Sequence, residues 1–392
     1  MKLLYITTHP IHNLIPLYRE LNKKKDINFV SINWINVPQN HYDYDFGKII
    51  NFKVDYNVGY QNQYLINNKK DIDNFNNHKW ILIKLKIIFK LTKLILCKKF
   101  DIIIFHQYLY PNIIGAIFAK MIGKKTVMRS ISYNLGKRNF FKVCLRYLYY
   151  RFSNIFIDDY WAVHDLNEEF FLSHGAKKKN IYLIDHGQSD HKHLISNNPN
   201  LLLSNNEFCN KYNLPKNKKF ILFAAKFIKK KNPKILLESF HQANLDNNWF
   251  LLMVGNGKLE NEIKEYVKIN KITNIKFFDF LDQEKLISFF HNSEILALPS
   301  GVGETHGNII TEAIQFGCAL LLSNKVGLNL ECTREEMGLV FDIDNKEQLT
   351  KNLELICQNK NLLKKFQANA LEYGKKKTPV HAANLIMKYL KL

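Results

Sequence analysis

The chain has 392 residues, of which 46% are hydrophobic and 13% are aromatic. This length is enough for about two domains with their own cores, and the composition excludes a disordered chain. A formal net charge of +21 predicts an anionic partner: nucleic acid, an acidic lipid surface or a phosphorylated substrate.

The first half of the chain alternates apolar runs with segments of helical periodicity. Residues 2–8, KLLYITT, predict a strand, and the leucines of the next segment, HNLIPLYREL, recur at helical spacing. The run DIIIFH at residues 101–106 predicts another strand, followed by a helix in NIIGAIFAKMIG that stops at Gly123. The sequences KTVMRS, YWAVH and IYLIDHG predict three further strands in this half.

The segment Trp80–Cys97, WILIKLKIIFKLTKLILC, is the longest apolar run, and four lysines interrupt it. A membrane-spanning helix needs about 20 residues with few or no charges, so we do not expect this segment to cross a membrane. The surrounding region is strongly basic, because residues 74–157 contain sixteen Lys or Arg residues and one acidic residue, Asp101. An Asn/Lys/Ile-rich composition that places lysines on solvated faces explains this charge equally well.

A polar segment at residues 191–219 interrupts the alternation and predicts a domain boundary. The alternation starts again with FILFAAK at residues 220–226 and continues through WFLLMVG, NIKFFDF, EILALPS and ALLLSN, with helical segments between them. Apolar strands that alternate with amphipathic helices form parallel sheets covered on both faces. The sequence therefore predicts an α/β fold of two Rossmann-like parallel-sheet domains that face a central cleft.

The six cysteines are scattered along the chain and form no CxxC pair. This pattern fits a reducing compartment and argues against a disulfide framework or a structural zinc site. The first residues, MKLLYITTHP, lack the basic segment and long apolar run of a signal peptide. We therefore expect a cytoplasmic protein.

Residues 301–327 place a glycine-rich loop between a strand and a helix. The loop GVGETHG follows the strand EILALPS, and NIITEAIQF after it predicts a helix that a glycine ends. Ligands of open α/β sheets lie at the carboxyl ends of the strands, where a helix N-terminus offers free N–H groups to an anion. We therefore expect a phosphate to face the backbone amides of Thr305, His306, Gly307 and Asn308.

Two glutamates flank the start of this helix, Glu304 and Glu312, with seven residues between them. Helical side chains lean back toward the N-terminus, so Glu312 on the second turn reaches toward the same ligand. A carboxylate repels phosphate but accepts hydrogen bonds from sugar hydroxyls. The pair therefore indicates a nucleotide sugar, which has hydroxyls at both ends and phosphate between them. The spacing alone is also common on solvated helices, and its position after a glycine-rich loop favours a function.

The same stretch resembles the Glu-x7-Glu signature of the GT-B glycosyltransferases of family 4 (glycosyltransferase group 1), a retaining family that uses nucleotide-sugar donors. The segment FILFAAKFIKKKNPKILLESF is similar to the family's strand with two basic positions, and LLMVGNGKLENEI to its G-x-G-x-L loop. The start, THPIHNLIPLYREL, resembles a bacterial subgroup of the family. The resemblance spans most of the chain and is strongest over residues 220–324.

The resemblance implies roles for residues at the donor. Glu312 would hold the nucleotide ribose and Glu304 the transferred sugar. Lys226 and Lys231 would face the diphosphate, since fixed cations stabilise the charge of a leaving diphosphate. Solvated lysines in KFIKKKNPK are the alternative for these two residues. The resemblance also assigns to donor binding the loop glycines Gly255 and Gly257. It implies a UDP- or GDP-sugar as donor substrate and no metal or other cofactor.

On the acceptor side the chain departs from the family pattern. His9 and Pro10 replace the usual Gly-Gly loop, and Arg129 stands where a common active-site histidine is expected. We expect His9 and Arg129 to act in catalysis. His12 and His106 lie at the same predicted edge and are equally consistent with structural hydrogen bonds.

Together these features predict a retaining glycosyltransferase of the hexosyltransferase type. It would move a sugar to a saccharide or lipid-linked saccharide in bacterial surface polysaccharide synthesis (O-antigen, capsule or lipopolysaccharide). The expected parts are an acceptor-binding domain at 1–195, a nucleotide-sugar-binding domain at 196–370 and a C-terminal helix at 371–392 that packs back on the first domain.

Two alternatives stay open at this point. A sugar-nucleotide epimerase or phosphorylase would share the GT-B fold. A basic nucleic-acid-binding protein would explain the net charge, but a Glu-x7-Glu loop disfavours it because carboxylates repel a phosphate backbone. We therefore expect no nucleic-acid partner.

The basic segment at residues 80–97 predicts a contact with an anionic membrane surface. On a helix, Lys79, Lys86, Lys90 and Lys93 would fall within about 60° of one another. Such a stripe beside apolar residues suits an anionic bilayer, and KRNFFKVCLRYLYYRF at residues 137–152 is a second basic-aromatic segment. We therefore expect a peripheral protein on the inner face of the cytoplasmic membrane. The alternative is an internal helix whose lysines are merely solvated.

Overall fold

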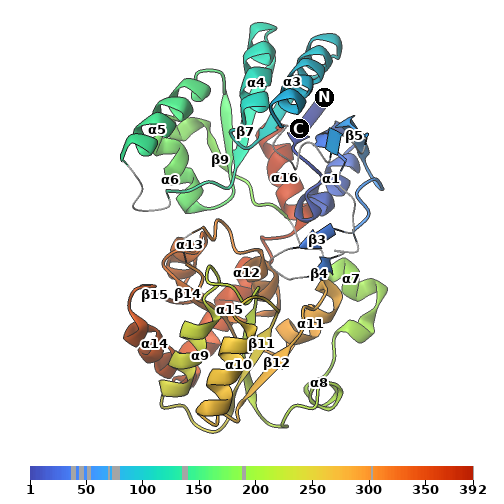
Figure 1. Cartoon of the computed structure of the whole chain (residues 1–392). Helices are drawn as coiled ribbons and strands as arrows, with labels where there is room; N and C mark the ends of the chain where they lie inside the picture. The colour runs from blue at the N-terminus through green and yellow to red at the C-terminus, as the bar shows by residue number, and fades with distance from the viewer. Residues whose placement is uncertain are drawn as a thin grey trace. The chain divides into compact units, whose positions relative to one another are not determined.

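The computed structural model describes residues 1–36, 41–43, 48–50, 54–68, 71–72, 80–134, 140–187, 191–301 and 303–391. The chain divides into two α/β units, each built on a parallel sheet (Figure 1). The first unit comprises Met1–Gln39, Lys53–Gln188 and Pro379–Leu392, and the second comprises Asn40–Phe52 and Ser189–Thr378. Among the described residues, no helix is both long enough and apolar enough to cross a membrane.

The described part of the first unit contains a sheet of seven parallel strands in the order β5-β2-β1-β6-β7-β8-β9. The strands are β1 (Lys2–Thr7), β2 (Asn28–Ile35), β5 (Gln61–Ile66), β6 (Ile102–His106), β7 (Lys125–Ser130), β8 (Asp159–Ala162) and β9 (Ile181–Leu183). The helices are α1 (Ile15–Asn22), α3 (Trp80–Cys97), α4 (Tyr110–Met121), α5 (Phe140–Asn154), α6 (Asp165–Ser173) and α16 (Pro379–Leu390). The strand order reverses between β1 and β6, which marks the edge where ligands of doubly wound sheets bind.

Successive side chains of these strands point to opposite faces of the sheet, so each strand contributes to two cores. Leu4 and Ile6 of β1 pack with α3, α4 and α6 on one face. Leu3 and Tyr5 pack with α1 and α16 on the other. Because both faces are buried, the central strands are continuous apolar runs, which is the pattern that predicted them.

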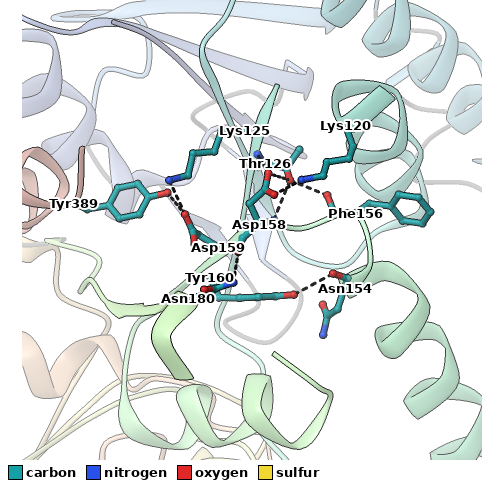
Figure 2. Close-up of polar contacts among 10 residues, drawn as sticks. All are labelled: Lys120, Lys125, Thr126, Asn154, Phe156, Asp158, Asp159, Tyr160, Asn180 and Tyr389. Carbon is teal, nitrogen blue, oxygen red and sulfur yellow. Dashed lines mark hydrogen bonds and ion pairs between the residues drawn. The ribbon is translucent and has the colours of Figure 1, made fainter. Parts of the chain in front are cut away.

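The last helix of the chain, α16, lies beside α1 in the first unit (Figure 1). The hydroxyl of Tyr389 near its end donates a hydrogen bond to Asp159 Oδ2 at 2.6 Å. Lys125 Nζ lies 2.8 Å from the same oxygen, so β7, β8 and α16 meet at one carboxylate (Figure 2). Hydrogen bonds to a charged group are stronger than neutral ones, and this contact fixes the end of α16 to the sheet.

The described part of the second unit contains a sheet of six parallel strands in the order β12-β11-β10-β13-β14-β15. The strands are β10 (Lys219–Ala224), β11 (Trp249–Val254), β12 (Ile275–Phe278), β13 (Ile295–Leu298), β14 (Ala319–Ser323) and β15 (Gly338–Phe341). The helices are α7 (His191–Asn197), α8 (Asn205–Lys211), α9 (Pro233–Gln242), α10 (Glu260–Ile269), α11 (Gln283–His291), α12 (Asn308–Ala313), α13 (Asn329–Arg334), α14 (Lys346–Gln358) and α15 (Lys360–Gly374). Two short strands, β3 (His41–Asp43) and β4 (Lys48–Ile50), pair antiparallel.

The second sheet also separates two cores. Phe220 and Leu222 of β10 face a core with α8, α11, α12 and α15, while Ile221 and Phe223 face one with α9, α10 and α14. The order again reverses, between β10 and β13, as in a dinucleotide-binding sheet. The predicted α/β fold with two parallel sheets is confirmed.

The contact of Tyr389 with Asp159 gives a prediction on stability. Tyr389→Phe should lower the free energy of unfolding of the first unit by about 1–3 kcal/mol, because it removes a hydroxyl that donates to a carboxylate and keeps the ring. Denaturant unfolding can be followed by tryptophan fluorescence, since Trp161 lies 5.6 Å from the Tyr389 ring between centroids.

Tyr182→Phe is the matched control for this variant. Its ring also contacts Tyr389, at 4.5 Å between centroids, and the described residues show no hydrogen bond of its hydroxyl. Equal destabilisation by the two substitutions would show that the bond to Asp159 does not hold α16.

Candidate active site

The second unit places the carboxyl ends of β10 and β13 next to each other, because these two strands are paired neighbours in the sheet. The loop after β10 carries Lys226 and Lys231, and the loop after β13 carries Glu304. Three of the predicted site residues therefore lie at one edge of the sheet, at the switch point where the strand order reverses.

Lys231 and Glu304 form an ion pair between Nζ and Oε2. Their side chains are 20% and 10% exposed, so the pair is largely removed from water and is screened less than a surface pair. An ammonium has three N–H donors and a carboxylate has several acceptor sites. The pair can therefore bind an anion through the lysine and a hydroxyl through the glutamate at the same time.

Backbone hydrogen bonds tie the neighbouring loops around this pair. The Glu304 carbonyl accepts from the Gly327 amide at 2.9 Å, which links the loop after β13 to the segment after β14. The Gly301 amide donates to the Lys230 carbonyl at 2.7 Å, which links it to the loop after β10. The positions of both charged side chains are thus set by three loops.

Glu312 lies buried on α12, and its Oε1 accepts a hydrogen bond from Gln283 Nε2 at 3.2 Å. Gly307 precedes the helix with φ at 80°, a left-handed conformation that favours glycine. A Cβ there would lie 2.8 Å from Ile310 Cδ1, so a side chain would push into the first turn. α12 itself is six residues long and continues into one 3-10 turn, Ile314–Phe316.

The four residues expected to present their amides to a phosphate differ in their surroundings. His306 and Gly307 are buried, Thr305 is half-buried and Asn308 is exposed. Contact of these amides with a phosphate stays a prediction.

Gly255 and Gly257 pack the loop after β11 against the loop after β10. A Cβ on Gly255 would lie 2.0 Å from the Ala225 carbonyl oxygen, and one on Gly257 would lie 2.6 Å from the Phe227 carbonyl oxygen. Their φ angles of 146° and 151° also favour glycine. The two glycines therefore allow the backbone of the β11 loop to pack closely against the loop that carries the two lysines. Their contact with a ligand stays a prediction.

In the first unit His9 and His106 stand at the carboxyl ends of neighbouring strands, β1 and β6. His9 is exposed, with Nδ1 2.8 Å from Thr8 Oγ1. His106 is buried, with Nδ1 3.0 Å from the Tyr5 hydroxyl. Burial, together with the charges of Arg129 and His9, lowers the pKa of His106 to about 3. His106 is therefore a neutral hydrogen-bonding residue near pH 7.

Arg129 of β7 is completely buried. Its Nη2 donates to the Asp185 carbonyl at 2.9 Å and lies 3.2 Å from His186 Nδ1, and its guanidinium lies 5.9 Å from the Trp161 ring centroid. These contacts hold the segment that follows β9. The predicted catalytic role of Arg129 stays a prediction, and the structure gives it a positioning role.

Two residues at these edges were not singled out by the sequence. Gln283, which bonds Glu312, begins α11 and follows the Asp282 cap, a position that no motif marks. Gln107 directly follows β6 with φ at 70°, a conformation that is uncommon for non-glycine residues. The described residues contain no group of three His, Cys, Asp or Glu side chains that could hold a metal ion.

Residues 204–373 match the family model described as glycosyl transferases group 1. A curated relative is the N-acetylgalactosamine-N,N'-diacetylbacillosaminyl-diphospho-undecaprenol 4-alpha-N-acetylgalactosaminyltransferase of Campylobacter jejuni subsp. jejuni serotype O:2. It is 25% identical over 174 residues, which are 44% of this chain and 46% of that protein. An uncharacterized glycosyltransferase of Methanocaldococcus jannaschii is 25% identical over 157 residues, 40% of this chain and 43% of that protein. The chain thus matches less than half the length of these relatives.

Solved structures are similar over the whole chain. The crystal structure of Anabaena HepE in complex with UDP has a TM-score of 0.70 at 13% identity and covers 100% of both chains. The apo form of the lipopolysaccharide outer core galactosyltransferase WaaB has a TM-score of 0.68 at 13% identity, also over 100% of both chains. The chain therefore has the GT-B fold, and its residues 204–373 match the model of the glycosyl transferases group 1 family.

Proposed function

We propose that this chain is a retaining glycosyltransferase. It moves a sugar from a UDP- or GDP-sugar to a saccharide or lipid-linked saccharide acceptor of a bacterial surface polysaccharide. The observation that carries the proposal is the ion pair of Lys231 and Glu304 at the switch point of the unit that matches the family. Two similar proteins support the proposed substrates. The name of the Campylobacter enzyme contains a diphospho-undecaprenol acceptor, and the HepE structure is of a complex with UDP.

The donor would lie at the carboxyl edge of the second sheet, with its phosphates at Lys226 and Lys231. Glu304 would accept hydrogen bonds from the transferred sugar, and Glu312, oriented by Gln283, would accept them from the ribose. Two lysines at the diphosphate supply fixed positive charge where negative charge develops during transfer. We therefore propose that the reaction needs no metal ion.

The proposed step is a front-face displacement. The acceptor hydroxyl oxygen bonds to the anomeric carbon while the bond from that carbon to the diphosphate oxygen breaks. The hydroxyl proton passes to the leaving phosphate, so no enzyme base is needed and the anomeric configuration is kept. The sequence indicates no third carboxylate as a nucleophile, which favours this route over a covalent intermediate.

The acceptor would bind the first unit, where His9 is exposed at the carboxyl edge of the sheet. A lipid-linked acceptor places the enzyme at the inner face of the cytoplasmic membrane. All six cysteines are free thiols, which supports a cytoplasmic location.

A donor screen tests the function. The purified chain is incubated with single UDP- and GDP-sugars, and release of the free nucleoside diphosphate is measured. We expect slow hydrolysis of one donor and faster release when a saccharide acceptor is added. Conversion of a donor into another nucleotide sugar would instead indicate an epimerase, and no turnover of any donor would contradict the proposal.

The two carboxylates should have separable effects. Glu312→Ala should weaken donor binding at least about tenfold, because a carboxylate that accepts two sugar hydroxyls is lost. Glu304→Ala should mainly lower kcat, because its partner is the transferred sugar. Steady-state kinetics with the donor found in the screen separate the two effects. Glu265→Ala on the exposed side of α10 is the control, and near-normal kinetics of either site variant would refute its assigned role.

The two lysines should act on the leaving group. Lys226→Ala and Lys231→Ala should each slow transfer by about a hundredfold or more, the effect of losing one fixed charge that stabilises the transition state. Lys229→Ala, which changes an exposed lysine of the same loop, should keep the wild-type rate. Single-turnover rates measure this, and equal rates for all three variants would make Lys226 and Lys231 ordinary surface lysines.

A further inference from the structure

Helix α5 of the first unit exposes the side that an amphipathic helix normally buries. Of its fifteen residues, Ser153 is the one that is buried. Tyr147, Tyr149, Tyr150 and Asn154 make further contacts with the rest of the unit. Its apolar stripe points away from that contact, with exposed fractions of 75%, 59%, 63% and 52% for Phe141, Leu145, Leu148 and Phe152. At 3.6 residues per turn these four side chains fall within about 60° of one another.

Helix α3 carries a second stripe of the same kind. Its buried side, Ile83, Ile87, Leu91 and Ile95, packs on the sheet and on α4. Its exposed stripe consists of Leu82, Leu85, Phe89 and Leu96, each at least half exposed and all within about 60° on the helix.

The two stripes belong to two helices of one unit, and α4 contacts both of these helices. Tyr110, at the start of α4, lies between them: Lys84 of α3 is 6.0 Å from its ring centroid, and the Tyr149 ring of α5 is 5.4 Å from it. In Figure 1 the helices α5, α4 and α3 are drawn from left to right in the upper part of this unit. Tyr110 is itself exposed, so it adds an exposed aromatic side chain beside the two helices.

Two of the four lysines expected to face a bilayer, Lys86 and Lys90, contact other parts of the chain instead. Lys86 forms an ion pair with Asp71, and Lys90 donates to the Leu65 carbonyl at 2.6 Å, so both point to the chain's own β5 side. Lys79 and residues 137–139 lie outside the described residues. What α3 offers to its surroundings is therefore the apolar stripe with lysines along its border.

The charged residues of the two helices are all basic. Helix α5 contains Lys142, Arg146 and Arg151 and no acidic residue, and α3 contains four lysines and no acidic residue. Contiguous exposed apolar surface marks an interaction site, and cations beside it select an anionic partner.

We propose that the exposed stripes of α3 and α5 form a docking surface for an anionic lipid bilayer. Phe and Leu side chains would enter the boundary between headgroups and acyl chains while the bordering Lys and Arg contact the headgroups. A second copy of this chain is the main competitor, because the spacing of the α5 stripe also suits a helix pair. It is disfavoured, since self-association would bring the same basic residues against each other.

Vesicle co-sedimentation tests the surface, with phosphatidylcholine vesicles made with and without phosphatidylglycerol. We expect the full chain to bind the anionic vesicles and to be released by salt. Phe141→Ser/Phe152→Ser, Leu85→Ser/Phe89→Ser and Lys142→Glu/Arg146→Glu should each weaken binding at least about tenfold. Ile269→Ser is the matched control, since this residue is 69% exposed on α10 of the second unit.

The inference rests on the proposed function only for the lipid-linked acceptor. Vesicle binding is measured without donor or acceptor, so the membrane surface and the proposed function can fail separately. Donor hydrolysis should be unchanged in every surface variant, which also shows that each one folds. No binding of the wild type at low salt, equal binding to neutral vesicles, or full binding by the double variants would overturn the proposal. Sedimentation velocity that shows a dimer broken by Phe141→Ser/Phe152→Ser would assign the surface to a second copy instead.

Discussion

The ion pair of Lys231 and Glu304 joins two loops whose paired residues are 73 positions apart in the sequence. Each side chain is largely removed from water, so burying either charge without its partner would be costly. The parallel order of β10 and β13 brings the loops together, and the glycines of the β11 loop allow close backbone packing beneath them. A site of this kind depends on the whole sheet, because no single segment supplies both charges.

The first unit distributes its charge differently. Its interior cation, Arg129, is covered by protein and holds the segment after β9, and His106 beside it is kept neutral. Burial also raises the pKa of Tyr5 to about 12, so its hydroxyl remains a donor at physiological pH. Helices α3 and α5 of this unit carry lysines and arginines beside exposed apolar side chains.

The sequence predicted the central strands because a parallel strand buried on both faces is a continuous apolar run, as in β1, β6, β10 and β13. It did not indicate β5, QNQYLI, which lies at the edge of the sheet and is half polar, or β15, GLVF, which is short and lies at the other sheet's edge. The strand–loop–helix unit pointed to Glu304 and Glu312, and the family resemblance pointed to Lys226 and Lys231. The pairing of Lys231 with Glu304 and the bond of Gln283 to Glu312 could not be predicted, because they depend on strand order and on a helix far along the chain.

The sequence also could not predict which single charged residues are buried or turned toward the protein. VMRSIS predicts that Arg129 lies on a strand, but the contacts made by its guanidinium come from residues 185 and 186 on a later segment. The lysines of α3 likewise repeat at helical spacing, and only the position of β5 shows that two of them turn toward the protein.

The central claim is that the second unit holds a nucleoside diphosphate through fixed lysines. Calorimetric titration of the full chain with UDP, GDP, uridine and guanosine tests this most directly. One of the two diphosphates should bind at one site per chain, and the matching nucleoside without phosphates should bind far more weakly. Absence of binding by both diphosphates, or equal binding of diphosphate and nucleoside, would contradict the account.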